Sequence, residues 1–358
     1  MSSSGTTRSN AIDPPLEIAI GANELATQEG ADQDEGVVVV VAAVTHGLPA
    51  PGRRNEVFVP WMHDKNALLL LDSALRRRHR GRLPDTLRIS TGALKAFVTW
   101  QIEHAIDPAR YGVRFIGTNS FRLSPHWKEL IQSHLGCVLF DNYSLSEFAT
   151  PATECKACGG LHWGDPPVFW EVIDLDDASP LPEKTGSTGE LVLSSRAPFV
   201  TLMPLIRYRT GDVVSLGKIC AVTKQRAFTF LGRRRRGVVV DGAFVLPPTL
   251  LQDVLEAFPD TERGMHPLVT LGILRSRELG LPRFVVDDDG AVLRLRFETR
   301  YHPGLYRHAA AGLVEHVRHA VLKGDAPLRG LLRRRRRRLV VEAVAPGTLA
   351  PPPDKYDP

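Results

Sequence analysis

Cysteine is scarce in this sequence. Its four cysteines among 358 residues are too few to cross-link a chain of this length, which excludes a disulfide-rich secreted scaffold and favours a reducing compartment. Long apolar runs are also absent: none approaches the roughly 20 residues of a membrane-spanning helix, and the first residues lack the apolar segment of a signal peptide. We therefore expect a cytoplasmic protein with no membrane partner.

A large excess of charge of one sign is missing as well. The chain carries 45 Lys and Arg residues against 40 Asp and Glu residues, a formal net charge of +5. The basic excess is concentrated in arginine runs at residues 76–78, 233–236 and 333–338. Such runs can bind polyphosphate or nucleic acid, although solvated turns and helix ends often carry them too. Aromatic residues do not alternate with these arginines, so we expect no specific nucleic-acid partner.

The first two-thirds of the chain predict alternating strands and helices. The apolar run GVVVVVAAV at residues 36–44 has the composition of a strand that is buried on both faces, as in parallel sheets. Helices are expected over residues 64–78 and 92–105. This alternation is typical of an α/β domain.

The clearest unit is a predicted strand–helix–strand. An apolar strand, VRFI, leads into the loop GTN, and Ser124 and Pro125 then begin a helix as its N-cap and first residue. Gly136 ends this helix before a second strand at residues 137–140. Since ligands of open α/β sheets bind beyond the carboxyl ends of the strands, the loops GTN and DNYSLSE are both expected to face a ligand cleft.

From Gly189 on, short strands follow one another (GELVLSS, PLIRYRTGD, AFTFLGR), and a domain boundary is expected at Arg233. Beyond it the pattern predicts helices over residues 248–257 and 304–322 and strands over residues 268–274, 292–298 and 339–345. The predicted fold is α/β. It has a large domain (residues 1–232) with a mostly parallel sheet and a short-strand subdomain, and a small α+β C-terminal domain (residues 233–358).

Three polar motifs are of the kind that binds a nucleotide. The stretch MSSSGTTRSN at the N-terminus can surround a phosphate with backbone N–H groups and short hydroxyls. In DNYSLSE, Tyr143 can stack on a base, Ser146 can bond a phosphate and Glu147 can bind Mg²⁺. In YRTGD, Asp212 can bind ribose hydroxyls. Each motif has a structural alternative: a disordered end for MSSSGTTRSN, a surface turn with capping residues for DNYSLSE, and an ordinary Gly-Asp turn for YRTGD.

A second group of residues has the spacing of a metal site. Cys155 and Cys158 form a C-x2-C pair in ECKACGGLHW, and His162 follows four residues later. Cys220 can supply the fourth ligand, which would close a tetrahedral, structural zinc site. Free buried cysteines are the alternative, and Cys137 lies inside a predicted core strand without such neighbours.

Several motifs stand in the order expected of one family. They are SSGTT (3–7), NYSLSE (142–147), GELVL (189–193), PLIRYRTGD (204–212), FLGR (230–233) and PGTL…DK (346–355). With them the chain resembles adenylate-forming enzymes of the AMP-binding superfamily, most of all the phenylacetate–CoA ligase branch. The resemblance covers nearly the whole chain and implies that the family's N-terminal portion, which precedes the phosphate loop, is lacking.

The resemblance implies a two-step reaction. ATP and a small carboxylic acid, aromatic by analogy, give an acyl-adenylate and pyrophosphate, and the acyl group then passes to CoA, with Mg²⁺ as the metal. Transfer to an amine or a carrier protein, and a remnant that binds nucleotide without catalysis, are the alternatives. Domain rotation about residues 233–236 is implied between the steps, and a homodimer is compatible with the sequence.

The resemblance also implies roles for individual residues. Catalytic roles fall to Lys355, Glu147 and Ser146, with Glu147 as the Mg²⁺ ligand. The other residues would bind the nucleotide and the acyl group: Ser3, Ser4, Gly5, Thr6 and Thr7 at the phosphates, Gly117, Thr118 and Asn119 beside adenine and the acyl pocket, Tyr143 at adenine, and Asp212 and Arg233 at the ribose.

Four positions depart from the family's pattern. Arg8 follows the two threonines and Ser144 follows the tyrosine, in both cases where glycine is usual. Arg235 occupies a hinge position at which an aspartate is typical, and Asp354 precedes the lysine in place of glycine. These departures bear on the rate of the implied reaction.

Overall fold

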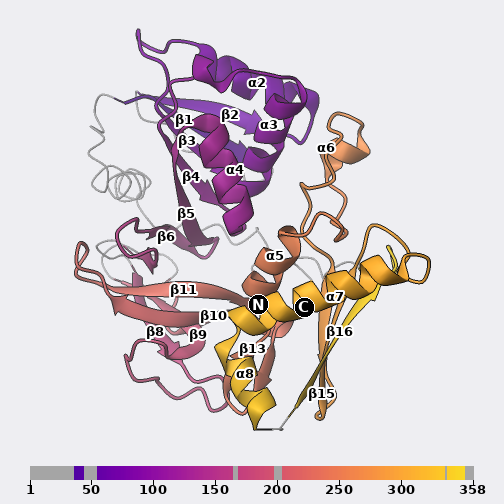
Figure 1. The fold of residues 1–358 in the computed structure, drawn as a ribbon. Helices are drawn as coiled ribbons and strands as arrows, with labels where there is room; N and C mark the ends of the chain where they lie inside the picture. Colours follow the sequence, from indigo (N-terminus) through magenta and orange to yellow (C-terminus); the bar gives the residue numbers. More distant parts are fainter. Residues whose placement is uncertain (1–35, 44–54, 164–167, 197–203, 335–336, 351–358) are drawn as a thin grey trace.

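Figure 1 shows the computed structural model of the protein, which describes residues 36–43, 55–163, 168–196, 204–334 and 337–350. Its largest element is one sheet of 11 strands in the order β2-β1-β3-β4-β5-β6-β7-β11-β10-β9-β8. The strands at one end of this order run parallel to one another. They are β2 (Glu56–Trp61), β1 (Val38–Ala43), β3 (Thr86–Ser90), β4 (Phe115–Asn119) and β5 (Val138–Leu145).

Helices occupy the connections between these parallel strands, as predicted. They are α2 (Lys65–Arg76), α3 (Thr91–Glu103) and α4 (Pro125–Leu135). In α4 the expected caps are confirmed: Ser124 accepts the N–H of Trp127, and Gly136 ends the helix with a φ of 63°. These local signals therefore determine where α4 begins and ends.

The other end of the sheet is antiparallel. Its strands are β6 (Phe148–Glu154), β7 (Leu161–His162), β11 (Arg226–Arg233), β10 (Tyr208–Ile219), β9 (Thr188–Ser195) and β8 (Val168–Ile173). The loop expected at DNYSLSE is wrong in part, because β5 continues through Leu145 and pairs with β6. GTN likewise belongs to β4 and is not a loop.

The C-terminal region is smaller and mixed, as predicted. Strands β12 (Val238–Val240) and β13 (Ala243–Val245) form a hairpin, and β14 (Phe284–Asp288), β15 (Val292–Glu298) and β16 (Arg338–Val344) form a second sheet. Its helices are α5 (Pro248–Glu256), α7 (Arg307–Gly324) and α8 (Ala326–Arg333). These helices and strands enclose a separate hydrophobic core. The exact division at residues 232 and 233 stays a prediction.

The strand expected over residues 268–274 is wrong. The chain forms a short helix there, α6 (Pro267–Thr270), whose N-cap His266 accepts the N–H of Leu268 at 3.3 Å. Leu268 and Leu274 are buried in the core of the parallel half of the large sheet. The apolar residues therefore pack against a surface that is distant in sequence and do not alternate across a sheet.

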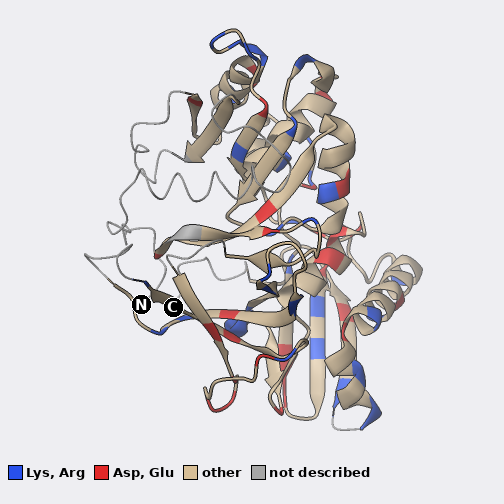
Figure 2. Ribbon diagram, turned by 90° about the vertical axis from the view of Figure 1, so that its left-hand side faces the viewer, with Lys and Arg blue, Asp and Glu red and all other residues tan. Residues whose placement is uncertain are grey.

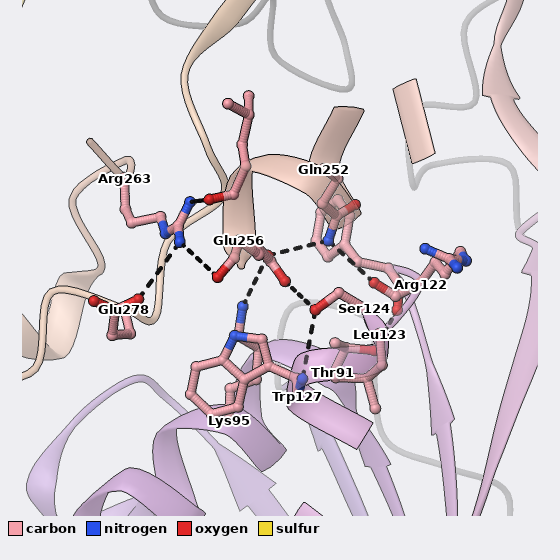
Figure 3. Close-up of polar contacts among 12 residues, drawn as sticks. Thr91, Lys95, Arg122, Leu123, Ser124, Trp127, Gln252, Glu256, Arg263 and Glu278 are labelled. Atoms are coloured by element: carbon pink, nitrogen blue, oxygen red, sulfur yellow. Dashed lines mark hydrogen bonds and ion pairs between the residues drawn. The ribbon is translucent and has the colours of Figure 1, made fainter. Parts of the chain in front are cut away.

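Helix α5 contacts the parallel half through a polar network, and Figure 3 shows the part of it around Glu256. Oε1 of Glu256 lies 3.5 Å from Nζ of Lys95 on α3, and its other oxygen accepts a hydrogen bond from Ser124 at the start of α4. Asp253 forms a bidentate ion pair with Arg122 at 2.5 and 2.9 Å. We call these five residues the Glu256 network. It fixes the C-terminal end of α5 to α3 and to the segment that begins α4.

The arginine runs lie at the ends of elements. Residues 76–78 end α2, and residues 333 and 334 end α8, where blue segments gather in Figure 2. The run at residues 233–236 lies at the end of β11, and Arg233 and Arg234 form ion pairs with Asp212 and Glu190. Within the described part of the chain, no helix is both long and apolar enough to cross a membrane.

Candidate functional site

Three of the predicted nucleotide-binding residues meet where β5, β10 and β11 lie together. The hydroxyl of Tyr143 donates a hydrogen bond of 2.6 Å to Oδ2 of Asp212. Nε of Arg233 lies 3.0 Å from Oδ1 of the same carboxylate, because Asp212 and Arg233 are paired across β10 and β11. The carboxylate of Asp212 is thus oriented from both sides, and this residue is only 2% exposed.

A bulge in β10 places Asp212 at this point. The pairing of β10 with β9 shifts between Arg209 and Val213, and Gly211 in between has a φ of 71°. This backbone conformation suits glycine, which has no Cβ to clash. The hydroxyl of Thr210 accepts the N–H of Asp212 at 3.0 Å. A bulge of this kind redirects side chains beside functional sites, which explains why YRTGD forms more than an ordinary turn.

Tyr143 is anchored among aromatic rings. Its ring centroid lies 6.0 Å from those of Trp163 and Phe228, both edge-on, and 5.5 Å from that of Phe230. Burial, and then the neighbouring Asp212 carboxylate, raises the pKa of Tyr143 well above its usual range. Tyr143 therefore keeps its proton and remains the hydrogen-bond donor to Asp212. That the ring stacks on adenine stays a prediction.

Glu147 has the environment expected of a cation ligand. It lies with Ser146 in the tight turn between β5 and β6. Its Oε1 accepts a hydrogen bond of 2.8 Å from the hydroxyl of Tyr208. Its Oε2 is buried and has no hydrogen-bond partner among the residues that the structure describes. A buried carboxylate oxygen without a donor is costly, and a hard cation such as Mg²⁺ would satisfy it. The residues present therefore fit the metal.

The residues Gly117, Thr118 and Asn119 end β4 beside this region. Thr118 is fully buried, and its hydroxyl donates toward Oδ1 of Asp141 at 3.2 Å. Asn119 is exposed at the carboxyl end of the strand. Burial raises the pKa of Asp141 to about 6. Thr118 is thus hydrogen-bonded within the sheet, and Asn119 has the position that a ligand could reach. The roles of Gly117, Thr118 and Asn119 beside adenine and the acyl pocket stay predictions.

Other predicted residues cannot be placed. The phosphate-loop residues and the catalytic lysine lie outside the described part of the chain: Ser3, Ser4, Gly5, Thr6, Thr7 and Lys355. Their roles stay predictions.

The predicted zinc ligands come together at the far end of β6, β7 and β10. Ligand atoms of Cys155, Cys158, His162 and Cys220 all lie within 4.8 Å of one another. The sulfurs of Cys155 and Cys220 are 3.8 Å apart, and the sulfur of Cys158 is 3.0 Å from Nε2 of His162. Zinc–sulfur bonds of about 2.3 Å at tetrahedral angles put two sulfurs about 3.8 Å apart. The donor set and its spacing therefore fit one tetrahedral zinc ion.

Comparisons with known proteins bear on the fold and on the class of protein. No protein-family model matches the chain. In the phenylacetate–coenzyme A ligase of Escherichia coli (strain K12), 134 residues align at 31% identity, which covers 35% of this chain and 29% of that protein. The phenylacetate–coenzyme A ligase of Pseudomonas putida aligns over 184 residues at 28% identity, covering 48% and 39%. The alignments thus span well under half of these relatives.

Solved structures extend the likeness to nearly the whole chain. A 2-hydroxyisobutyryl-CoA ligase, in an open conformation with 2-HIB-AMP and CoA, superposes with a TM-score of 0.62 at 17% identity, over 95% of this chain and 69% of that one. A benzoate CoA ligase from Burkholderia xenovorans LB400 gives 0.59 at 15% identity, over 94% and 63%. The chain therefore has the fold of the adenylate-forming CoA ligases.

The sequence relatives point to one branch of this class. Over the aligned residues the chain is similar to phenylacetate–coenzyme A ligases.

Proposed function

We propose that the protein is an AMP-forming acid–CoA ligase. The observation that carries this proposal is the meeting of Tyr143, Asp212 and Arg233 at the bulge of β10. In such a site Asp212 would bind the ribose hydroxyls, Arg233 would contact the ribose beside it, and Tyr143 would lie at adenine. Phenylacetate–coenzyme A ligases as sequence relatives support the reaction class.

The first step would join the acid to AMP. A carboxylate oxygen of the acid attacks the α-phosphorus of ATP, and the bond to the pyrophosphate group breaks, so that acyl-AMP and pyrophosphate form. Glu147 would hold the Mg²⁺ ion, which neutralises phosphate charge when bound. Ser146 would donate to the α-phosphate, and residues 3–7 would surround the β- and γ-phosphates. Lys355 would stabilise the charge that develops during this step.

The second step would transfer the acyl group to CoA. The thiol sulfur attacks the acyl carbonyl carbon, the bond to AMP breaks, and the thiol proton is released. Between the steps the C-terminal domain would rotate about residues 233–236. We propose a small aromatic acid as substrate, since phenylacetate and benzoate appear in the names of relatives.

An exchange assay tests the adenylation step. The protein is incubated with ATP, labelled pyrophosphate and a panel of carboxylic acids, and incorporation of label into ATP is measured. We expect exchange with at least one aromatic acid, and we expect Asp212→Asn to reduce it at least about tenfold, because the variant loses a charged ribose contact. Exchange followed by transfer to an amine or a carrier protein, and not to CoA, would favour the second alternative. ATP binding without exchange for any acid would favour a nucleotide-binding remnant.

We also propose that Cys155, Cys158, His162 and Cys220 bind one structural zinc ion. Their mutual distances, within 4.8 Å, support this proposal. Metal analysis should find about one zinc per chain, and Cys158→Ser, which replaces the exposed ligand, should lower it. Cys137→Ala is the control, because this buried cysteine is not one of the four residues whose ligand atoms come together. Folded protein that purifies without zinc and takes none up would contradict the site.

A further inference from the structure

Glu190 on β9 is a buried carboxylate opposite the bulge of β10. The residue is 3% exposed and is paired with Val213, the first residue after the register shift. Its side chain therefore extends toward the stretch of β10 that carries Asp212. A buried carboxylate needs charged or N–H partners to offset the loss of hydration.

Glu190 has such partners on two different segments. Arg209, just before the bulge, donates to both oxygens of Glu190 at 3.1 and 2.5 Å. The N–H of Gly211, inside the bulge, lies 3.3 Å from Oε1. Arg234, the residue after β11, approaches Oε2 at 3.5 Å. One carboxylate thus contacts both the turn that holds Asp212 and the segment at which the C-terminal region begins.

The two arginines differ in how firmly they are held. The side chain of Arg209 is 50% exposed, so without Glu190 it would turn to solvent and the bulge would lose a support. Arg234 has a second anchor, since its Nη2 donates to the backbone oxygen of Leu175 at 2.5 Å. Loss of Glu190 would therefore remove the contacts of the turn with Arg209 and with the N–H of Gly211, and one of the two anchors of Arg234.

We propose that Glu190 is a positioning residue that links the nucleotide-binding turn to the segment at residues 233–236. This inference rests on the proposed function, because it takes Asp212 to be the ribose ligand. Through Glu190, the position of Asp212 and the conformation of residues 233–236 depend on each other. Nucleotide binding at Asp212 and the conformation of that segment are then coupled, and the coupling is reciprocal.

The experiment measures nucleotide affinity and backbone protection together. ATP binding by titration calorimetry and hydrogen exchange of residues 233–237 are compared for wild type, Glu190→Gln and Glu171→Gln. Glu171 is the matched control, because it pairs with Arg207 at 2.8 Å on the same half of the sheet without touching the bulge. We expect Glu190→Gln to weaken ATP binding about tenfold and to speed exchange at residues 233–237. Glu171→Gln should change neither quantity.

A double-variant cycle separates linkage from a general loss of stability. Arg209→Met and Arg234→Met are each expected to weaken ATP binding. If both arginines act through Glu190, the fold-loss of ATP affinity in the double variant will be smaller than the product of the two single fold-losses. We expect it to be smaller by a factor of about five. The inference would be overturned if the effects of the two single variants on ATP affinity multiply in the double variant. It would also be overturned if Glu190→Gln binds ATP as tightly as wild type does. Wild type that binds neither ATP nor AMP would instead refute the proposed function.

Discussion

Removing the charge of Glu256 should destabilise the protein strongly. The side chains of Glu256 and Lys95 are 1% and 5% exposed, so both charges are almost completely withdrawn from water. Lys95 lies 4.5 Å above the ring of Trp127, which adds a cation–π contact but no counter-charge. In Glu256→Gln the ammonium of Lys95 would remain buried without its nearest anion.

The structure sets the size of this effect. Breaking a buried ion pair by removing one partner costs about 3–5 kcal/mol, because the remaining charge stays uncompensated. Glutamine can still accept from Ser124, so we expect the lower part of this range, about 3 kcal/mol. Replacing both partners, as Lys95→Met with Glu256→Gln, removes the isolated charge and should recover at least half of the loss.

Urea unfolding at pH 7 measures these differences in the free energy of unfolding. Glu315→Gln is the control, because the ion pair of Glu315 with Arg318 is 71% and 48% exposed and should contribute under about 0.5 kcal/mol. A loss below about 1 kcal/mol for Glu256→Gln, or a double variant no more stable than the single one, would refute the reasoning.

The pH dependence gives a second check on the same pair. Burial lowers the pKa of Lys95, and the Glu256 carboxylate opposes that shift. In Glu256→Gln the carboxylate that opposes this shift is gone, so the pKa of Lys95 falls further. Lys95 then releases its proton more easily in the folded state than in the unfolded state. Unfolding then requires proton uptake, and the stability of the variant should rise as the pH increases from 7 toward the ordinary pKa of lysine, about 10.4.

Three further predictions concern other sites. Tyr143→Phe should raise the KM for ATP about tenfold, measured by pyrophosphate exchange, because Asp212 loses its 2.6 Å donor. Burial lowers the pKa of His266 to about 4, so between pH 7 and pH 5 the unfolded state takes up a proton at this residue and the folded state does not. Acidification over this range should lower the free energy of unfolding by about 1 kcal/mol after allowance for solvent screening. The variant His266→Asn should not show this loss. Stripping metal with a chelator should speed hydrogen exchange at residues 154–162, and added zinc should reverse it.

Local signals allowed the parallel half of the fold to be predicted from the sequence. Ser124, Pro125 and Gly136 determine α4 through contacts within a few residues, so no distant part of the chain is needed to read them. The stretch at residues 268–274 carries similar signals, Pro267 at the start and Gly272 with a φ of 67° after the end, but they enclose a helix of only four residues. Its leucines are buried against the parallel half, and that partner is invisible to a local pattern.

The candidate site was predictable only in part for the same reason. Tyr143, Asp212 and Arg233 could be named from their motifs. The partners that orient them depend on the register between strands, which the bulge at Gly211 shifts. Glu190 and Tyr208 therefore escaped prediction, although each lies inside a quoted motif. The polar composition of DNYSLSE suggested a loop, because its pairing with β6 depends on residues that follow it.

The contacts of α5 bear directly on the proposed rotation about residues 233–236. At its N-terminal end, Thr249 donates to the backbone oxygen of Leu231 at 3.0 Å. Pro248 packs so closely on Gly232 that a Cβ there would lie 2.8 Å from the proline ring. At its other end, α5 is fixed by the Glu256 network. Rotation would therefore have to separate α5 from β11 at one end and from α3 and the start of α4 at the other.

Glu256→Gln should consequently make that rotation easier. Spin-labelled amino acids at two exposed positions, Glu129 on α4 and His319 on α7, would report the distance between the two regions. We expect a single distance in wild type without ligands and a second, populated distance in Glu256→Gln. The substitution weakens contacts that exist only in the packed arrangement, so it shifts the equilibrium toward the rotated one. Glu315→Gln should match wild type. An unchanged distribution in a Glu256→Gln protein of reduced stability would mean that the network stabilises the fold without controlling the orientation of the C-terminal region.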